Sequence, residues 1–387
     1  MTDISLPLAL LGGLSPQVFM QRHWQRKPLL VRQAIPAAGL AATPSRALLF
    51  ALAADEDVES RLIRQEDAGW NMRSGPFARR ALPALTQTDW TLMVQGVDLH
   101  DDRAHALLNR FRFIPGARLD DLMVSYAGDG GGVGAHFDSY DVFLLQTSGR
   151  RRWRIGRQKD LALREGMPLK ILANFEPEQE YVLEPGDMLY LPPRYAHEGV
   201  ALGGDCITCS IGFRAPRRDE IAQDMLQRLA DEAVDEEAES KLYSDAGEPA
   251  TDQPGRIPPA LHAFAQAAVD RLLADRDALP RALGESLTEP KPTVFFDEIS
   301  EADEDAGWPP GVLALRLDRR TRMLYDDRHI FINGDSYRAA GRDARLMRQL
   351  ADSRMLDGAA VAGASEDARS LAWSWCVSGW AHLEKQE

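Results

Sequence analysis

The chain has 387 residues, more than one hydrophobic core usually serves, so two or three domains are expected. Hydrophobic residues make up 44% and charged residues 27% of it, a composition typical of a water-soluble globular protein. The formal net charge of −14 argues against a surface built for nucleic acid, which would be basic. An acidic surface favours a basic partner, although surplus carboxylates can also serve solubility alone.

Cysteine content and hydropathy indicate where the protein acts. Three cysteines are too few for a disulfide framework. No run of 18 apolar residues is present, and the first 30 residues lack a basic start followed by an apolar block. We therefore expect no membrane association and predict a cytoplasmic protein.

The amino-terminal third predicts short helices and strands in alternation. Ser15 can cap a helix that runs to Gln25, with Pro16 at its first position. Either Thr43 or Ser45 can cap a second helix that ends near residue 54. Strands are predicted over residues 28–31, 60–64, 70–73, 91–94 and 122–126, and a further helix over residues 101–111.

A glycine-rich segment follows and leads into a histidine. Gly130, Gly132 and Ala135 fit the pattern G-x-G-x-x-A, but what comes next is strand-like rather than the helix that a phosphate loop requires. We interpret the glycines as residues that let the chain bend tightly. Asp129 at the tip of this loop would then face an incoming substrate, or it is simply a turn aspartate; both interpretations stay open.

The strongest chemical signal is His136-Phe137-Asp138 together with the distant His197. Residues i and i+2 of a strand face the same side, so His136 and Asp138 would point at one place. His197, on a separate strand, would complete a set of two histidines and one carboxylate on one side of a metal. This set leaves three coordination positions of the metal open, which suits non-haem Fe(II). A structural zinc site usually has four protein ligands, often thiolates.

The segment between the ligands predicts several more strands. Residues 142–147 and 150–155 flank Ser148-Gly149, a pattern typical of a hairpin. Strands over 181–183 and 188–191 flank a Pro-Gly-Asp turn, and residues 206–213 predict another strand. Many short strands that carry ligands at separate places predict a small antiparallel barrel or jelly roll with the metal at its mouth.

This pattern resembles the JmjC-type cupin oxygenases, which are Fe(II)- and 2-oxoglutarate-dependent hydroxylases. It is most similar to the bacterial ribosomal oxygenases, which hydroxylate an arginine of large-subunit ribosomal protein L-sixteen at carbon 3. The residues that carry the resemblance are 19–31, 130–143, 149–153 and 212–216. The resemblance is sharp over the first 215 residues and looser beyond. It implies an α+β fold, a double-stranded β-helix followed by a helical region and a winged-helix-like domain. It also implies Fe(II) and 2-oxoglutarate as cofactors and a ribosomal protein as substrate.

Strand alternation and the resemblance together predict the cosubstrate site. Trp153 and Ile155 share a parity with Arg151, so Arg151 should point into the barrel with these apolar side chains. A buried guanidinium needs an anionic partner, either the far carboxylate of 2-oxoglutarate or an internal Asp or Glu. The resemblance also places a basic anchor for the cosubstrate on this strand. Thr208 and Ser210 share a parity and could line the same pocket or face solvent.

Residues beside the metal motif are candidates for substrate binding. A guanidinium brought to the iron needs acidic or aromatic groups at the mouth. Asp129, Tyr140 and Asp141 flank the motif in sequence and carry such groups. A carboxylate that binds the guanidinium through paired hydrogen bonds would fix its orientation.

The composition shifts after residue 215. Helices are predicted over 218–242, 258–274 and 279–286, followed by strands over 313–317, 322–325 and 329–332 and helices over 342–351 and 366–375. We expect a JmjC cupin catalytic domain over 1–215, a helical region over 216–289 and a winged-helix-like domain over 290–387. Related enzymes imply a homodimer through the helical region. The last domain mixes arginines with comparable acids, so a protein contact or scaffold role is expected rather than direct nucleic-acid binding.

Three functional hypotheses follow. The first is an Fe(II)- and 2-oxoglutarate-dependent protein arginine hydroxylase. The second is a cupin metalloenzyme that acts on a small molecule without 2-oxoglutarate, against which the inward parity of Arg151 argues. The third is a non-enzymatic regulator in which the cupin senses a ligand and the winged module binds DNA. The complete ligand set and the acidic charge count against that hypothesis.

Overall fold

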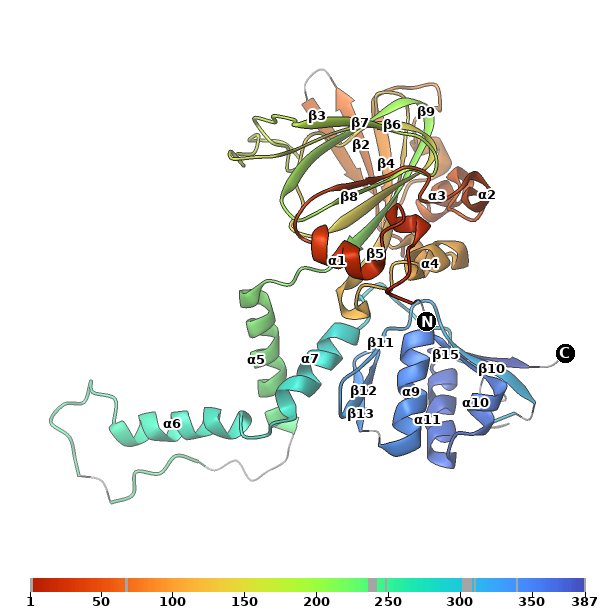
Figure 1. The fold of residues 1–387 in the computed structure, drawn as a ribbon. Helices are drawn as coiled ribbons and strands as arrows, with labels where there is room; N and C mark the ends of the chain where they lie inside the picture. Colours follow the sequence, from red (N-terminus) through yellow and green to blue (C-terminus); the bar gives the residue numbers. More distant parts are fainter. Residues whose placement is uncertain are drawn as a thin grey trace. The chain divides into compact units, whose positions relative to one another are not determined.

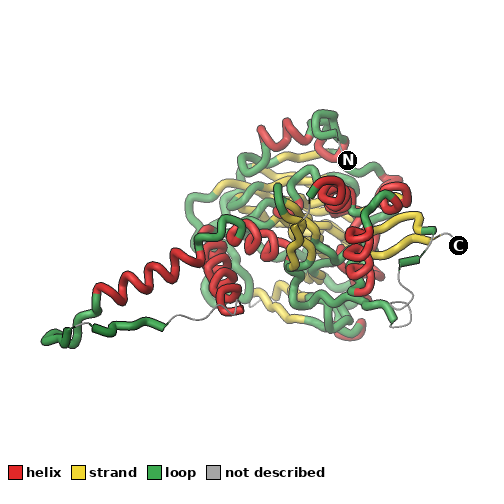
Figure 2. Tube along the Cα trace, turned by 90° about the horizontal axis from the view of Figure 1, so that it is seen from below, coloured by secondary structure: helices red, strands yellow, loops and turns green. Residues whose placement is uncertain are grey.

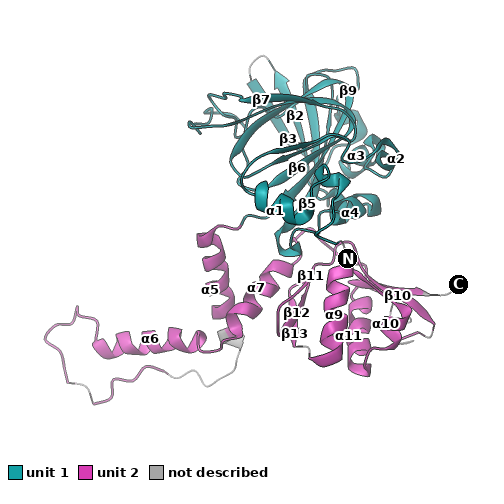
Figure 3. Ribbon diagram, in the orientation of Figure 1, with its two compact units in different colours: residues 1–215 teal, residues 216–387 magenta. Residues whose placement is uncertain are grey.

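The computed structural model describes residues 3–66, 69–235, 242–247, 249–300, 308–309, 311–338 and 340–385. The chain divides into two compact units, Met1–Ala215 and Pro216–Glu387 (Figure 3). Helices and strands both contribute (Figure 2), and the predicted α+β class is confirmed. The further division of the second unit at residue 289 stays a prediction. The helix predicted over 218–242 runs in part outside the described residues.

The first unit is built on one curved antiparallel sheet (Figure 1). Its strands follow the order β1-β8-β6-β9-β5-β4-β2-β3, and β7 pairs with β6. The two longest strands are β6 and β9. Strand β9 carries the predicted metal ligand His197, and β6 carries Arg151. The strands are β1 (Leu29–Val31), β2 (Ser60–Glu66), β3 (Gly69–Ser74), β4 (Trp90–Val94), β5 (Leu119–Ala127), β6 (Val142–Arg157), β7 (Gln179–Leu183), β8 (Met188–Leu191) and β9 (Tyr195–Phe213).

The hairpin predicted over residues 142–155 is wrong. These residues form the single strand β6, which pairs with β9 along its length. The pairing register shifts between Gln146 and Ser148 and again between Ser148 and Arg150. Gly149 lies there with φ +63°, a left-handed conformation that a side chain disfavours. Ser148-Gly149 therefore forms a bulge, which bends the strand without reversing it.

Local capping signals set the starts of the helices in the first unit. Ser15 accepts from Val18 N at 3.3 Å, Ser45 from Leu48 N at 3.3 Å, and Asp101 from Ala104 N at 2.9 Å. Of the two caps considered for the second helix, Ser45 is the one used. The helices are α1 (Pro16–Arg22), α2 (Ala37–Leu40), α3 (Arg46–Leu52) and α4 (Asp102–Asn109), with short 3₁₀ turns at Ala9–Leu11, Arg79–Ala81, Val97–Leu99 and Gly116–Arg118.

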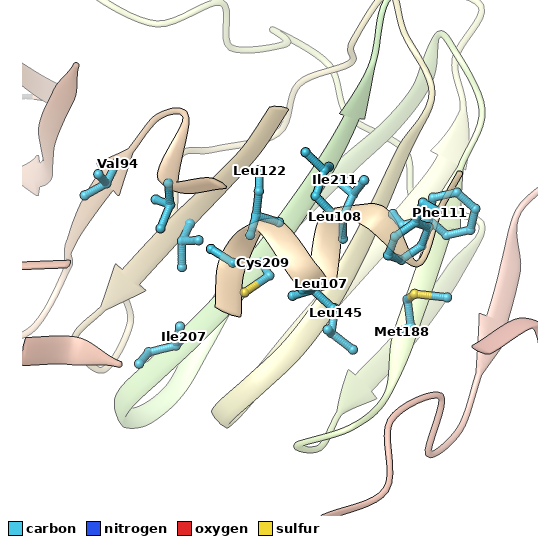
Figure 4. Packing of buried hydrophobic residues seen from close by; sticks show 14 of the residues in the cluster. Val94, Leu107, Leu108, Phe111, Leu122, Leu145, Met188, Ile207, Cys209 and Ile211 are labelled. Carbon is cyan, nitrogen blue, oxygen red and sulfur yellow. The ribbon is translucent and has the colours of Figure 1, made fainter. Parts of the chain in front are cut away.

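The main core of this unit includes the packing of helix α4 on one face of the sheet. Leu107 and Leu108 of α4 lie against Leu122 of β5 and Cys209 and Ile211 of β9 (Figure 4). Because neighbours along a strand face opposite sides, packing this set under α4 turns the alternate residues of β5 and β9 towards the inside of the barrel. The packing of the core therefore determines which side chains of β5 and β9 face the interior of the barrel.

The second unit combines helices with two small sheets. One sheet has the strand order β14-β10-β15 and the other β11-β12-β13. Their shared core includes Leu315, Ile330, Leu350 and Trp375. The helices are α5 (Arg218–Asp235), α6 (Pro259–Leu272), α7 (Ala278–Thr288), α9 (Gly341–Ser353), α10 (Gly358–Ala362) and α11 (Glu366–Val377), and the strands are β10 (Val312–Leu317), β11 (Met323–Tyr325), β12 (His329–Ile332), β13 (Asp335–Arg338), β14 (Met355–Asp357) and β15 (Ala381–Lys385).

Some short elements of the second unit were not predicted, namely β13, β14, β15 and α10. The residues of β13 and β14 are mostly polar or exposed, so they lack the apolar alternation that marks a strand. None of the helices in the described ranges is both long enough and apolar enough to cross a membrane.

Candidate active site

A cavity of about 420 Å³ lies inside the barrel of the first unit. Strands β2, β4, β5, β6 and β9 and the segment before β6 all contribute to its walls. The three predicted metal ligands line it, and so do Arg151 and Ser210. The structure thus brings together residues that lie far apart in the sequence.

The predicted ligands converge on one point. His136, Asp138 and His197 each offer a ligand atom, and these atoms lie within 4.8 Å of one another. His197 Nε2 is 3.7 Å from Asp138 Oδ2. Two imidazoles and one carboxylate, clustered on one side of a cavity, match the donor set of non-haem Fe(II) enzymes. The residues present therefore fit an iron ion.

The backbone around His136 differs from the predicted strand. His136 forms an isolated bridge with His197, in which His136 N donates to His197 O at 3.0 Å and His197 N donates to His136 O at 2.8 Å. The next two residues leave the sheet, because Asp138 O accepts instead from Arg194 N in the turn before β9. Asp138 thus reaches the ligand cluster from a loop rather than by strand alternation.

Backbone carbonyls orient both histidines for metal binding. His136 Nδ1 lies 2.9 Å from Gly134 O, and His197 Nδ1 lies 3.0 Å from Tyr195 O. A carbonyl only accepts, so both Nδ1 atoms carry the proton and both Nε2 lone pairs are available to a metal. Burial, together with the neighbouring His136, lowers the pKa of His197 to about 4. His197 is therefore neutral at pH 7, as a metal ligand must be.

Arg151 lies inside the cavity, as the strand parity predicts. Its side chain is 5% exposed, and Trp153 and Ile155 are buried on the same side. Nη1 donates to Ser125 Oγ at 3.2 Å and to Thr208 Oγ1 at 3.4 Å, while Nε has no hydrogen-bond partner. Within the described ranges no carboxylate pairs with this guanidinium. A buried cation that meets only neutral hydroxyls fits the carboxylate of a bound dianion such as 2-oxoglutarate.

The two hydroxyls predicted near the cosubstrate are placed differently. Ser210 lines the cavity directly. Thr208 is 1% exposed and lies behind Arg151, where its hydroxyl donates to Gln146 Oε1 at 2.9 Å and its oxygen accepts from Arg151. Gln146 is itself held by Ser148 O at 2.6 Å. Thr208 thus orients the arginine, and neither hydroxyl faces solvent.

Two carboxylates besides Asp138 line the cavity. Tyr140, one of the predicted substrate-binding residues, lines the cavity with Asp120 and Asp121. Burial and the carboxylates of Asp138, Asp121 and Asp120 raise the pKa of Tyr140, so its hydroxyl stays protonated. Asp121 accepts from Gln95 Nε2 at 2.8 Å and Gly96 N at 3.1 Å, which makes it a structural carboxylate. Asp120 is one-third exposed and lies 3.5 Å from Arg214 Nε.

Asp120 and Asp121 were not predicted as cavity residues, because the strand expected over residues 122–126 begins after them, whereas β5 begins at Leu119. The pairing of β5 with β9 is irregular between Leu119 and Leu122, and this irregularity turns both carboxylates into the cavity. An Asp-Asp pair directly before a predicted strand was the available signal. Alternation alone would have assigned one of the two to the outside.

The remaining predicted substrate residues, Asp129 and Asp141, are not among those that line the cavity. Asp129 is exposed, and its Oδ1 accepts from Gly203 N at 2.7 Å, which ties the glycine-rich loop to β9.

Asp141 is fully buried. Its carboxylate accepts from the Tyr190 hydroxyl at 2.6 Å and from Gln25 Nε2 at 3.1 Å, and Arg118 Nη2 lies 3.5 Å away. Burial raises the pKa of Asp141. The predicted substrate contact of Asp141 is therefore corrected to a structural role, because its carboxylate is fully buried, already bound by Tyr190 and Gln25, and absent from the cavity lining.

Comparisons with known proteins agree with this geometry. Family models for the JmjC domain and for the ROXA-like winged helix match residues 106–221 and 271–382. The chain is 32% identical to ribosomal protein uL16 3-hydroxylase of Escherichia coli K12 over 92% of this chain and 93% of that protein. It is similar to the X-ray structure of E. coli YcfD, with a TM-score of 0.80, 29% identity and coverage of 96% and 98%. A structure of the E. coli ribosomal oxygenase YcfD with cobalt and 2-oxoglutarate gives a TM-score of 0.75 at 28% identity and the same coverage. The chain belongs to the JmjC-domain ribosomal oxygenases.

Proposed function

We propose that this chain is an Fe(II)- and 2-oxoglutarate-dependent dioxygenase that hydroxylates carbon 3 of an arginine in ribosomal protein uL16. The observation that carries the proposal is one cavity that holds both the ligand cluster and the buried Arg151. A metalloenzyme without 2-oxoglutarate has no need for a buried guanidinium at that place. The similarity to the uL16 3-hydroxylase of E. coli supports the choice of substrate.

The chain's own residues position the reactants. His136, Asp138 and His197 would hold the iron, and Arg151 would bind the far carboxylate of 2-oxoglutarate. When bound, the iron and 2-oxoglutarate supply the oxidising chemistry that converts a C–H bond and O₂ into a C–OH bond, with succinate and CO₂ as co-products. The protein's part is to orient both partners and to exclude water from the barrel.

The carboxylate of Asp120 and the ring of Tyr140 in the cavity wall support an arginine as the reacting residue. The Asp120 carboxylate can accept two parallel hydrogen bonds from a guanidinium, an interaction that fixes orientation as well as position. The protonated hydroxyl and ring of Tyr140 offer a further polar contact and a flat apolar face beside it. A fixed guanidinium would present one carbon of the side chain to the iron, and this accounts for hydroxylation at a single carbon.

The direct test is a reaction with purified components. The full chain, Fe(II), 2-oxoglutarate and a uL16 peptide that contains the candidate arginine are incubated in air, and the product is sequenced by mass spectrometry. We expect one added oxygen atom on the arginine and equimolar succinate. A peptide with lysine at that position is the matched control and should not react. Succinate release without a modified peptide, or no turnover at all, would contradict the proposal.

We propose in addition that the protein acts as a homodimer in the cytoplasm, where ribosomal proteins are made. Helix α6 supports the dimer because none of its residues is buried, although Leu261 and Val269 are large apolar side chains. Such a face gains stability when a second copy covers it. Sedimentation of the full chain tests this proposal. Leu261→Glu with Val269→Glu should yield monomers, whereas Gln266→Glu, which adds charge at a polar position of α6, should not.

A further inference from the structure

Trp153 carries a buried donor for which the protein provides no acceptor. The side chain is 4% exposed and lines the cavity with Arg151 and the ligand cluster. Its Nε1 atom is buried and has no hydrogen-bond partner. Buried polar atoms of native proteins are nearly always bonded, so an unpaired donor in a binding cavity points to a ligand. An indole N–H can only donate, and the ligand atom must therefore be an acceptor.

The indole lies between the two ends of the proposed cosubstrate site. On strand β6 it stands two residues from Arg151 and two residues from Ile155, whose register partner on β9 is His197. The guanidinium carbon of Arg151 is 5.5 Å from the centroid of the indole, and the ring of His197 is 5.8 Å from it. A molecule that reaches from the metal ligands to Arg151 must therefore pass beside Trp153.

Strand β9 has a glycine opposite the indole ring, which leaves space for it. The register partner of Trp153 is Gly199, and a Cβ atom at that position would lie only 2.7 Å from two ring carbons. The backbone conformation of Gly199 is ordinary, so the close approach of the indole is what requires a glycine there. The missing side chain of Gly199 thus lets the six-membered ring of the indole pack against the backbone of β9.

We propose that the Trp153 N–H donates a hydrogen bond to a carboxylate oxygen of 2-oxoglutarate and, with Arg151, positions the cosubstrate. This inference rests on the proposed function. A carboxylate only accepts, so it satisfies both the indole donor and the guanidinium donors that the protein leaves unpaired. Such a bond to a charged acceptor is stronger than a neutral one, and a cavity closed to water strengthens it further.

The test measures binding rather than turnover. The full chain is loaded with Zn(II) in place of Fe(II), and 2-oxoglutarate affinity is measured by calorimetry. Trp153→Phe keeps a ring but loses the donor, and it should weaken 2-oxoglutarate binding roughly tenfold or more while Zn(II) affinity stays the same. Trp90→Phe is the matched control. Trp90 is also a buried indole of this sheet, but its N–H donates to Gln87 O, and it is not among the residues that line the cavity.

A second readout follows the N–H itself. In ¹⁵N-tryptophan-labelled protein, the indole signal that Trp153→Phe removes should move downfield when 2-oxoglutarate is added. If Trp153→Phe does not fold, benzothienylalanine at position 153, which replaces only the N–H by sulfur, takes its place in both experiments. Gly199→Ala keeps the donor but displaces the ring, and it should weaken binding as well.

The possible outcomes distinguish the proposed role of Trp153 from the proposed dioxygenase function. Wild-type affinity in Trp153→Phe together with an unmoved indole signal would overturn the role of Trp153 and leave the dioxygenase proposal intact. A wild-type chain that does not bind 2-oxoglutarate at all would overturn both. Loss of Zn(II) affinity in Trp153→Phe would show that the ring supports His197 instead, and would also overturn the inference.

Discussion

Replacing Arg151 by alanine tests the cosubstrate site most directly. The Arg151 side chain is 5% exposed, and its described protein partners are the neutral hydroxyls of Ser125 and Thr208. If its guanidinium binds a carboxylate of 2-oxoglutarate, the variant loses a charge-assisted contact that contributes about 1.5–3 kcal/mol. Since about 1.4 kcal/mol corresponds to a factor of ten, 2-oxoglutarate affinity should fall roughly ten- to a hundredfold. No carboxylate of the described residues loses its partner, so the variant is expected to fold.

The assay is calorimetric titration of 2-oxoglutarate into the Zn(II)-loaded chain, together with the dependence of succinate release on 2-oxoglutarate. Arg152→Ala is the matched control, because Arg152 is the next residue of β6 and its side chain lies on the opposite face. Arg151→Lys keeps the charge and loses the fork, and it should give an intermediate affinity. Unchanged affinity in Arg151→Ala, or a larger loss in Arg152→Ala, would refute the reasoning.

Three further outcomes test other parts of the site. His136→Ala should abolish metal binding and turnover yet keep the folded circular dichroism spectrum, and a fully active variant would refute the metal assignment. Asp120→Asn should raise the KM for the uL16 peptide about tenfold or more and leave 2-oxoglutarate affinity unchanged, since it removes a charged acceptor; equal KM values would exclude Asp120 as the guanidinium partner. Asp129→Asn can still accept from Gly203 N and should stay active, whereas Asp129→Ala should lose stability. An inactive, stable Asn variant would instead support direct substrate binding by Asp129.

The sequence by itself determined the parts of this protein that depend on local chemistry. Ser15 marked the start of α1, and Ser45 was one of two candidate caps for α3, because a cap needs only its own helix. His136, Asp138 and His197 were predicted as metal ligands from their residue types and spacing, and the structure brings the three together. The inward direction of Arg151 followed from its parity with Trp153 and Ile155, which is a property of any half-buried strand.

Only the tertiary structure decided the features that depend on strand pairing. The bulge at Gly149 keeps β6 as one strand beside β9, and the irregular pairing of β5 turns both Asp120 and Asp121 into the cavity. The unpaired indole N–H of Trp153 and the burial of Asp141 likewise depend on residues distant in the sequence. A bulge changes which side chains face inward, and its position depends on how two distant strands align. That alignment is a long-range property, and no local pattern of residues encodes it.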